Sequence, residues 1–256
     1  MSFEHSVCRW CYESTPLSEL AEWCREFGIR GIDLLTPEEA LEVAKFGRVC
    51  PVSTFPTTKD GLGCIERAFN KVEHHAPLQA LYTDYIPKCA DAGIDQVIVF
   101  SGNRDGLDDQ TGLENCAIGI EPLLKIAEAH NITLVMELLN SRVDHPDYQC
   151  DHTEWGVALC EKLGSDRFKL LYDIYHMQIM EGDVIATIER HHQYISHYHT
   201  GGVPGRNEID TTQELYYPAI VEAIRKTGYS GFIAQEFIPT WENPKDSLLD
   251  AIKRCS

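Results

Sequence analysis

Short apolar segments alternate with amphipathic helical patterns along the whole chain, and this alternation limits the possible folds more than any other feature. We predict strands over residues 7–10, 32–35, 49–55, 96–100, 132–136, 168–172, 194–198 and 232–235, each followed by a helical pattern. Alternation of this kind produces parallel strands joined by right-handed crossovers. Eight such units in 256 residues predict an α/β fold, a closed (β/α)8 barrel, rather than an open doubly wound sheet.

Helix boundaries and the lack of a linker support a single domain. Thr36 and Pro37 begin one helical pattern, as an N-cap residue and a first-turn proline should. Residues 61–90 hold one long or two shorter helical segments. No Pro-, Ser- or Gly-rich run and no block of like charge divides the sequence, so we predict one domain over residues 1–256. No GxGxxG motif follows the first strand, which disfavours a dinucleotide-binding fold.

Composition argues against several classes of partner. The formal charge of −18 and the isoelectric point near 4.9 give a surface that repels phosphate backbones, so we expect no nucleic acid partner. No run of about 18 apolar residues is present, so we expect no membrane span. The first residues lack the basic and apolar regions of a signal peptide. We interpret the ten cysteines as reduced thiols in a cytoplasmic protein.

Four polar residues close the last four predicted strands: Glu137, Asp173, His199 and Glu236. They lie 26 to 37 residues apart, about one βα unit each, so we expect them at the same height on the rim where such barrels keep their active sites. Three clustered carboxylates require a neutralising cation, and oxygen-rich ligation with a single imidazole suits Mn²⁺, Mg²⁺ or Co²⁺. The alternative is four unrelated strand-end residues, including an Asp173 that only caps the following helix.

Several segments carry a family resemblance. They are Tyr172-Asp-Ile-Tyr-His-Met-Gln-Ile-Met-Glu-Gly182, Gly31-Ile-Asp33, Met136-Glu-Leu-Leu-Asn140, Pro204-Gly-Arg-Asn-Glu-Ile-Asp210 and Gln235-Glu236. On these motifs the chain resembles the xylose isomerase-like TIM barrel superfamily and, within it, the hydroxypyruvate isomerases, whose sixth-strand motif reads YDIYHMQRMEG. The resemblance spans the whole chain but is diffuse before about residue 130. By analogy it also implies a homodimer.

The resemblance implies a metal-dependent isomerase. The four strand-end residues would bind the metal, and Glu137 and Glu236 would also act as the acid/base pair. The expected reaction interconverts an α-hydroxy aldehyde and a ketone in a small hydroxy-keto acid of the hydroxypyruvate and tartronate semialdehyde type. It passes through an enediolate that the metal stabilises as a Lewis acid. His176 would contact a substrate oxygen.

The chain departs from the hydroxypyruvate isomerase pattern at three places. His199 stands where those enzymes carry glutamine, as it does in the ketose 3-epimerases. The usual Glu-Pro-x-Asn after the fifth strand is Glu137-Leu-Leu-Asn140 here. The loop over 200–204 is short and lacks the basic residue that usually precedes its Pro-Gly. Arg206 is the candidate substitute for that residue. These departures concern the identity of the substrate rather than the metal site.

Further polar residues are candidates for substrate binding. Arg206 and Glu208 follow the seventh strand and could meet a carboxylate and hydroxyls of the substrate, or carry solvated loop charges. Asn140 could orient the substrate or cap its own loop. His197 faces the same side of its strand as His199, one layer deeper, so we expect a supporting or core role for it.

Other functions on this barrel stay open at the level of the sequence. A ketose 3-epimerase, a 2-oxo-tetronate isomerase or an inosose dehydratase could use the same metal site, and His199 favours the epimerase. The short chain favours a small acid. A DNA-repair endonuclease would need more ligands and a basic groove, against which the net charge of −18 argues. A non-catalytic sugar-binding barrel would be expected to lose one of the two glutamates, and both are present.

Overall fold

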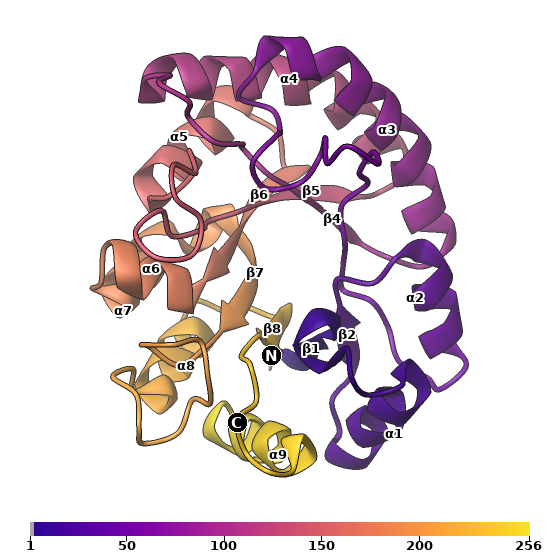
Figure 1. Ribbon diagram of the computed structural model, residues 1–256, viewed down its shortest axis with the longest axis vertical. Helices are drawn as coiled ribbons and strands as arrows, with labels where there is room; N and C mark the ends of the chain where they lie inside the picture. The colour runs from indigo at the N-terminus through magenta and orange to yellow at the C-terminus, as the bar shows by residue number, and fades with distance from the viewer. Residues whose placement is uncertain (1–2) are drawn as a thin grey trace.

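The predicted barrel is confirmed by the computed structural model, which describes residues 3–256; Met1 and Ser2 of the predicted domain lie outside the described residues. Eight parallel strands run in the order β2-β1-β8-β7-β6-β5-β4-β3. Strands β2 and β3 are joined only by isolated bridges, Gly31 to Val49 and Leu35 to Ser53. The barrel is therefore nearly closed, with helices arranged around the strands (Figure 1).

The elements follow the predicted alternation. The strands are β1 (Glu4–Cys8), β2 (Gly31–Asp33), β3 (Val52–Ser53), β4 (Gln96–Val99), β5 (Thr133–Glu137), β6 (Phe168–Asp173), β7 (Ile195–Thr200) and β8 (Phe232–Gln235). The helices are α1 (Leu17–Phe27), α2 (Pro37–Ala44), α3 (Val72–Asp91), α4 (Asp109–Ala129), α5 (Thr153–Leu163), α6 (Ile174–Met180), α7 (Val184–His191), α8 (Tyr217–Lys226) and α9 (Pro244–Arg254). Two 3₁₀ helices, η1 (Arg9–Tyr12) and η2 (His192–Tyr194), lie beside β1 and β7.

Three predicted boundaries are wrong. The first strand ends at Cys8, because the chain turns into η1 at Arg9. The third strand is only two residues long, and the helical segment predicted from residue 61 begins at Val72. A short helix, α6, starts directly after β6 because Asp173 caps it: its carboxylate accepts a hydrogen bond from the His176 amide at 3.2 Å. Asp173 therefore caps a helix, as the alternative interpretation had it, and His176 lies in the first turn of that helix.

Local sequence explains how the elements begin and end. The Thr36 side chain and Glu39 form a reciprocal capping box at the start of α2. Gly28 adopts a left-handed conformation with φ of 73° and ends α1. Gly31 is required for a different reason, since a Cβ atom there would lie 2.6 Å from Cγ of Pro51, next to the bridges between β2 and β3. No helix within residues 3–256 is long and apolar enough to cross a membrane.

A long loop after β5, residues 138–152, is anchored to the loop after β4. The Arg104 guanidinium donates to Asp151 at 2.9 Å and also bonds the Tyr148 carbonyl. The buried Tyr148 hydroxyl accepts from the Ser101 amide at 3.1 Å and donates to the Glu137 carbonyl at 3.0 Å. These bonds fix the loop relative to the end of β5, so that its side chains hold a defined position above the barrel.

We expect Arg104→Ala to lower the free energy of unfolding by about 1–3 kcal/mol, because it leaves the buried Asp151 carboxylate without its cation. Denaturant unfolding followed by circular dichroism measures the change. Arg25→Ala is the matched control, since Arg25 pairs only with the exposed Glu22 and should change stability by less than about 0.5 kcal/mol. Equal stability of the two variants would contradict the anchoring role of Arg104.

Candidate metal centre

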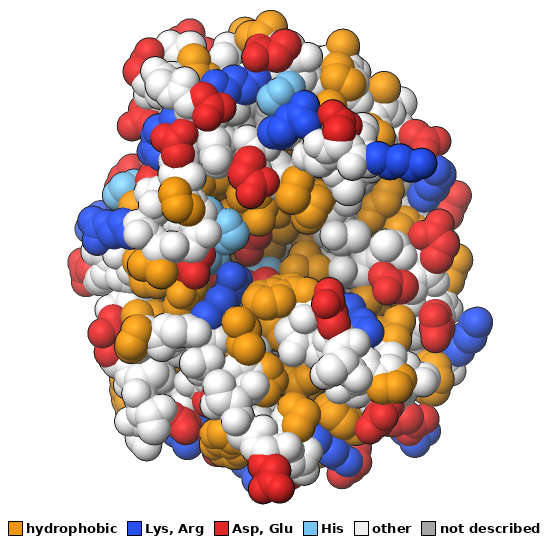
Figure 2. All heavy atoms as spheres, in the orientation of Figure 1, with side chains coloured by type: hydrophobic (Ala, Val, Ile, Leu, Met, Phe, Trp, Pro, Cys, Tyr) orange, Lys and Arg blue, Asp and Glu red, His pale blue; other side chains and the backbone are white. Residues whose placement is uncertain are grey.

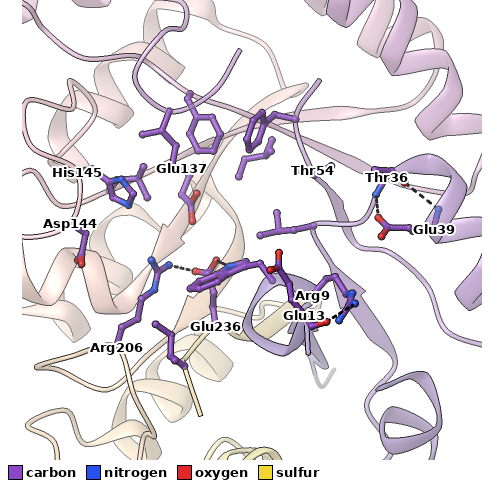
Figure 3. A pocket seen from close by; sticks show the side chains of 18 of the residues that line it. Arg9, Glu13, Thr36, Glu39, Thr54, Glu137, Asp144, His145, Arg206 and Glu236 are labelled. Carbon is purple, nitrogen blue, oxygen red and sulfur yellow. Dashed lines mark hydrogen bonds and ion pairs between the residues drawn. The ribbon is translucent and has the colours of Figure 1, made fainter. Parts of the chain in front are cut away.

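The four strand-end residues converge at the carboxyl-terminal mouth of the barrel. Glu137, Asp173, His199 and Glu236 are all buried, and each offers one ligand atom within 4.8 Å of the others. Figure 3 shows Glu137 and Glu236 directed into the same cavity. The space-filling view has a hollow in the middle of this face, with acidic and histidine side chains at its bottom (Figure 2). The sequence-predicted residues therefore come together in space.

Their backbone positions are not at one height, contrary to the expectation from spacing. Asp173 pairs directly with His199 across β6 and β7. Glu137 pairs with Leu171, two residues before Asp173, and His199 pairs with Ala234, two residues before Glu236. Strands in a barrel are tilted and staggered, so the four side chains meet even though their residues are offset along the sheet.

His199 lies at the centre of the cluster. Its Nδ1 atom is 2.8 Å from Oε2 of Glu236 and 3.2 Å from Oε1 of Glu137. The indole of Trp10 donates to the other oxygen of Glu236 at 2.7 Å. Oε1 of Glu137 and Nε2 of His176 are buried without a hydrogen-bond partner among residues 3–256. Buried polar atoms without partners are rare, and this set of oxygen atoms around one imidazole fits a divalent cation.

Burial and neighbouring charges shift the pKa values of Asp173 and Glu236 in opposite directions. Desolvation and the negative charge of Glu236 raise the pKa of Asp173 well above its ordinary value. Desolvation also opposes ionisation of Glu236, but the charges of Arg206 and His199 outweigh it and hold the pKa of Glu236 well below its usual range. A divalent ion bound here would therefore compete with protonation of Asp173.

Arg206 supplies positive charge to the cluster. Its Nη2 atom lies 3.1 Å from Oδ2 of Asp173 and 2.6 Å from Oε2 of Glu236. The guanidinium stacks at 5.0 Å on the ring of Trp10 and at 5.3 Å on that of Tyr175. Arg206 lines the cavity (Figure 3), and its buried Nε has no hydrogen-bond partner among residues 3–256.

A second buried group supports His199 from below. Oδ2 of Asp33, at the end of β2, lies 2.5 Å from Nε2 of His197 and 3.6 Å from Nε2 of His199. Cys8 Sγ lies 3.7 Å from the same His199 nitrogen. A carboxylate beside one ring nitrogen favours the proton there and leaves Nδ1 free to bind a cation. His197 thus has the supporting position that the sequence predicts, and the sequence missed its partner Asp33.

His176 and Asn140 form one unit beside the cluster. The Asn140 side-chain nitrogen lies 2.7 Å from Nδ1 of His176, and the Asn140 amide donates to the same atom at 3.2 Å. The other nitrogen of His176, Nε2, lies 3.5 Å from Oδ2 of Asp173 and faces the cluster. Asn140 lies outside the cavity lining and also accepts hydrogen bonds from the Val143 and Asp144 amides.

Glu208 lies apart from the other predicted site residues. Its carboxylate accepts hydrogen bonds from the Thr240 amide and hydroxyl, the Trp241 amide and the Ser247 hydroxyl, at 2.6 to 3.1 Å. These bonds use both oxygens to fasten the loop after β8, and Glu208 is absent from the cavity lining. The alternative prediction, a solvated loop charge, is wrong, because Glu208 is buried and the fold brings four donors to it.

Sequence reasoning missed Asp144 and His145, which both line the cavity. They lie on the long loop after β5, and Figure 3 shows both on the side of Glu137 and Arg206. Their position directly after a predicted strand could have identified them, because the loops that follow barrel strands form the active-site face. Neither residue belongs to a segment that carried the resemblance, so the motifs did not point to them.

Comparison with known proteins gives the family. Residues 9–255 match the family described as xylose isomerase-like TIM barrel. The chain belongs to this family. The predicted membership is therefore confirmed over nearly the whole sequence.

Named relatives are isomerases. A 2-oxo-tetronate isomerase of Cupriavidus necator is 37% identical over 129 residues, 50% of this chain and 47% of that protein. A hydroxypyruvate isomerase of Escherichia coli is 30% identical over 129 residues, 50% of this chain and 48% of that protein. These two matches thus span about half of each relative. A solved structure titled AP endonuclease, family 2, from Brucella melitensis has a TM-score of 0.85, covers 96% of both chains and is 21% identical, which shows the shared fold alone.

Binding of Mn²⁺ should release protons, because the metal requires the carboxylate form of Asp173 and the neutral form of His199, and the pKa values of both groups are raised. Affinity for Mn²⁺ should therefore increase as the pH rises above the ordinary pKa of Asp173. Titration calorimetry in two buffers of different ionisation enthalpy measures the released protons, and Asp173→Asn should reduce their number. Identical heats in both buffers for the unmodified protein would contradict this assignment.

Asp33→Asn should weaken Mn²⁺ binding by about 10- to 100-fold, since it removes the charge that fixes the His199 tautomer. Cys8→Ser is the matched control, because it changes a neutral neighbour of the same nitrogen and should bind Mn²⁺ nearly as well as the unmodified chain. Calorimetry gives both affinities, and circular dichroism verifies folding. If the Asp33→Asn variant folds and its affinity for Mn²⁺ is unchanged, Asp33 does not support His199 in metal binding.

Proposed function

We propose that this chain is a divalent-metal-dependent isomerase of a small hydroxy-keto acid, of the hydroxypyruvate and tartronate semialdehyde type. The observation that carries the proposal is the placement of Glu137 and Glu236 in one buried ring with Asp173 and His199, at the bottom of a single cavity. Two carboxylates at a common cation site suit proton transfer between neighbouring carbons. The isomerase relatives support the reaction class.

The residues of the four-residue cluster have separate roles in the proposed reaction. With Mn²⁺ or Mg²⁺ bound, or Co²⁺ as a further candidate, the site would polarise the substrate oxygens and stabilise the negative charge of the enediolate. Glu137 ends β5 and Glu236 follows β8, so they approach the substrate from different sides of the ring. One would remove the proton from the hydroxyl-bearing carbon and the other would return a proton to the neighbouring carbon, while the hydroxyl proton passes to the former carbonyl oxygen. The two glutamates then exchange their protons with solvent after product release, so no net proton is consumed.

Substrate orientation falls to residues beside the ring. Arg206 is the cation next to the cluster and would hold the substrate carboxylate through its planar donors. His176 would donate from Nε2 to a substrate oxygen, and Asn140 would fix its ring by bonding Nδ1. We leave Glu208 out of the binding site because its oxygens are occupied elsewhere.

A ketose 3-epimerase is the second candidate. It would use the same ring and the same two glutamates, and His199 in the seventh-strand position favours it. The cation that contacts the four-residue cluster, Arg206, favours an acid instead, because a neutral sugar needs no charged partner. Product identity separates the two: a 3-epimer from a ketose, or tartronate semialdehyde from hydroxypyruvate.

Other features fit an enzyme of small molecules. The ten cysteines are all free thiols, eight of them buried, which suits the reducing cytoplasm that we propose as its location. The net charge of −18 disfavours the endonuclease alternative. Both glutamates are retained, which disfavours a non-catalytic sugar-binding barrel. The homodimer implied by the resemblance stays a prediction.

Glu137→Gln and Glu236→Gln should each lower kcat on hydroxypyruvate by at least about 100-fold with Mn²⁺ present, because each removes one proton-transfer group. The barrel should stay folded, as circular dichroism would verify. Glu114→Gln, an exposed change on α4, is the control and should keep full activity. A panel of three-, four- and six-carbon substrates, read by product identity, tests the reaction class. Full activity in either ring variant would rule out the two-carboxylate mechanism.

A further inference from the structure

The cavity above the cluster of Glu137, Asp173, His199 and Glu236 is larger than a three-carbon acid requires. Its volume is about 970 Å³, at the upper end of the range for small-molecule sites. Much of its wall is apolar, and this wall consists of Leu34, Phe55, Ile65, Ile98, Phe100, Leu139 and Ile238. Phe55 and Phe100 pack edge to face at 5.1 Å, so this part of the wall is well defined. Polar side chains line the cavity on both sides of the four-residue cluster: Arg9, Glu13, Thr36, Glu39 and Thr54 on one side, and Asp144 and His145 beside Glu137 and Arg206 on the other (Figure 3).

His145 is a polar group on that side without a partner. Its ring nitrogens make no hydrogen bond to any residue in the described range 3–256, and the ring lines the cavity. The ring packs on that of His176 at 5.4 Å, and the His145 amide donates to the Asn140 carbonyl at 3.1 Å. Figure 3 shows the imidazole directed toward the space between Glu137 and Arg206. The imidazole is thus held in place and available to a ligand.

Asp144 adds a second polar atom next to it. Oδ2 of Asp144 accepts from the Tyr175 hydroxyl at 2.8 Å and from the Asn140 side chain at 2.5 Å. These bonds fix the carboxylate and leave Oδ1 without a partner among the described residues. Burial lowers the pKa of His145, so its neutral ring offers one donor and one acceptor. Together the two side chains suit a hydroxyl group, which needs both an acceptor and a donor.

We infer that His145, with Asp144, binds a hydroxyl that the substrate carries beyond its two reacting carbons. The inference rests on the proposed function, because it assigns the reacting carbons to the ring and the carboxylate to Arg206. A three-carbon hydroxy-keto acid has no atom left for this contact. The preferred substrate is therefore an acid of at least four carbons with a further hydroxyl, and His145 is the residue that selects it.

The test compares two substrates that differ by one hydroxymethylene group, with Mn²⁺ present. One is hydroxypyruvate, and the other is the four-carbon 2-oxo acid with hydroxyls on carbons 3 and 4. The unmodified enzyme should show a higher kcat/KM for the four-carbon acid. His145→Leu should reduce that preference by about fivefold or more, mainly through KM, since it removes one hydrogen bond. His145→Gln should keep part of it.

The ratio between substrates distinguishes a specific contact from a loosened loop. A structural defect in His145→Leu would lower kcat/KM for both acids alike and leave the preference unchanged, which would overturn the inference. Preference of the unmodified enzyme for hydroxypyruvate would overturn it as well. His192→Leu is the matched control, because His192 lies in η2, before β7 and at the end of the strand away from the cavity, and should change neither value.

The same measurements separate the inference from the proposed function. If the unmodified, Mn²⁺-loaded enzyme converts neither acid, the proposed function fails and the inference falls with it. If it converts both and His145→Leu leaves their ratio intact, the isomerase assignment stands and only the role of His145 is lost.

Discussion

The mutual repulsion of three carboxylates buried at the barrel mouth is the constraint on which the rest of the structure depends. Glu137, Asp173 and Glu236 come from different strands and cannot all be ionised together without compensation. The protein supplies that compensation from two sides: Arg206 approaches from the loop above, and His199 stands between the acids. Such a cluster costs stability, and the cation binding proposed for it would offset that cost.

The fold and the inner ring were predictable because their signals are local. Long apolar runs mark β4 to β8, and a polar residue at the end of such a run marks the rim of a parallel barrel. The expected equal height of the four residues failed because sequence spacing does not report strand tilt: Glu137 and Glu236 are offset by two residues from the Asp173 and His199 pair. The side chains nevertheless reach the same point.

What the sequence did not reveal depends on contacts between distant segments. Asp33 meets His197 across the barrel, 164 residues away in sequence. Glu208 looks like a free loop charge until the loop after β8 folds onto it. His145 lies in a polar loop whose conformation depends on bonds from Arg104 to Asp151 and from the Ser101 amide to Tyr148, each between residues 47 apart in sequence. Pairings of this kind are decided by tertiary packing, for which periodicity holds no signal.

The uneven closure of the barrel has a consequence for how such enzymes diversify. Strands β5 to β8, which bring the acids and the imidazole together, are joined by parallel ladders with one register shift in β6, whereas β2 and β3 meet only through isolated bridges. Phe55 and Leu34 of the apolar wall border this weaker seam. Substitutions near the β2–β3 seam can therefore reshape the apolar wall of the cavity while the strands that bring the four-residue cluster together keep their pairing. One reaction mechanism could then serve several substrates.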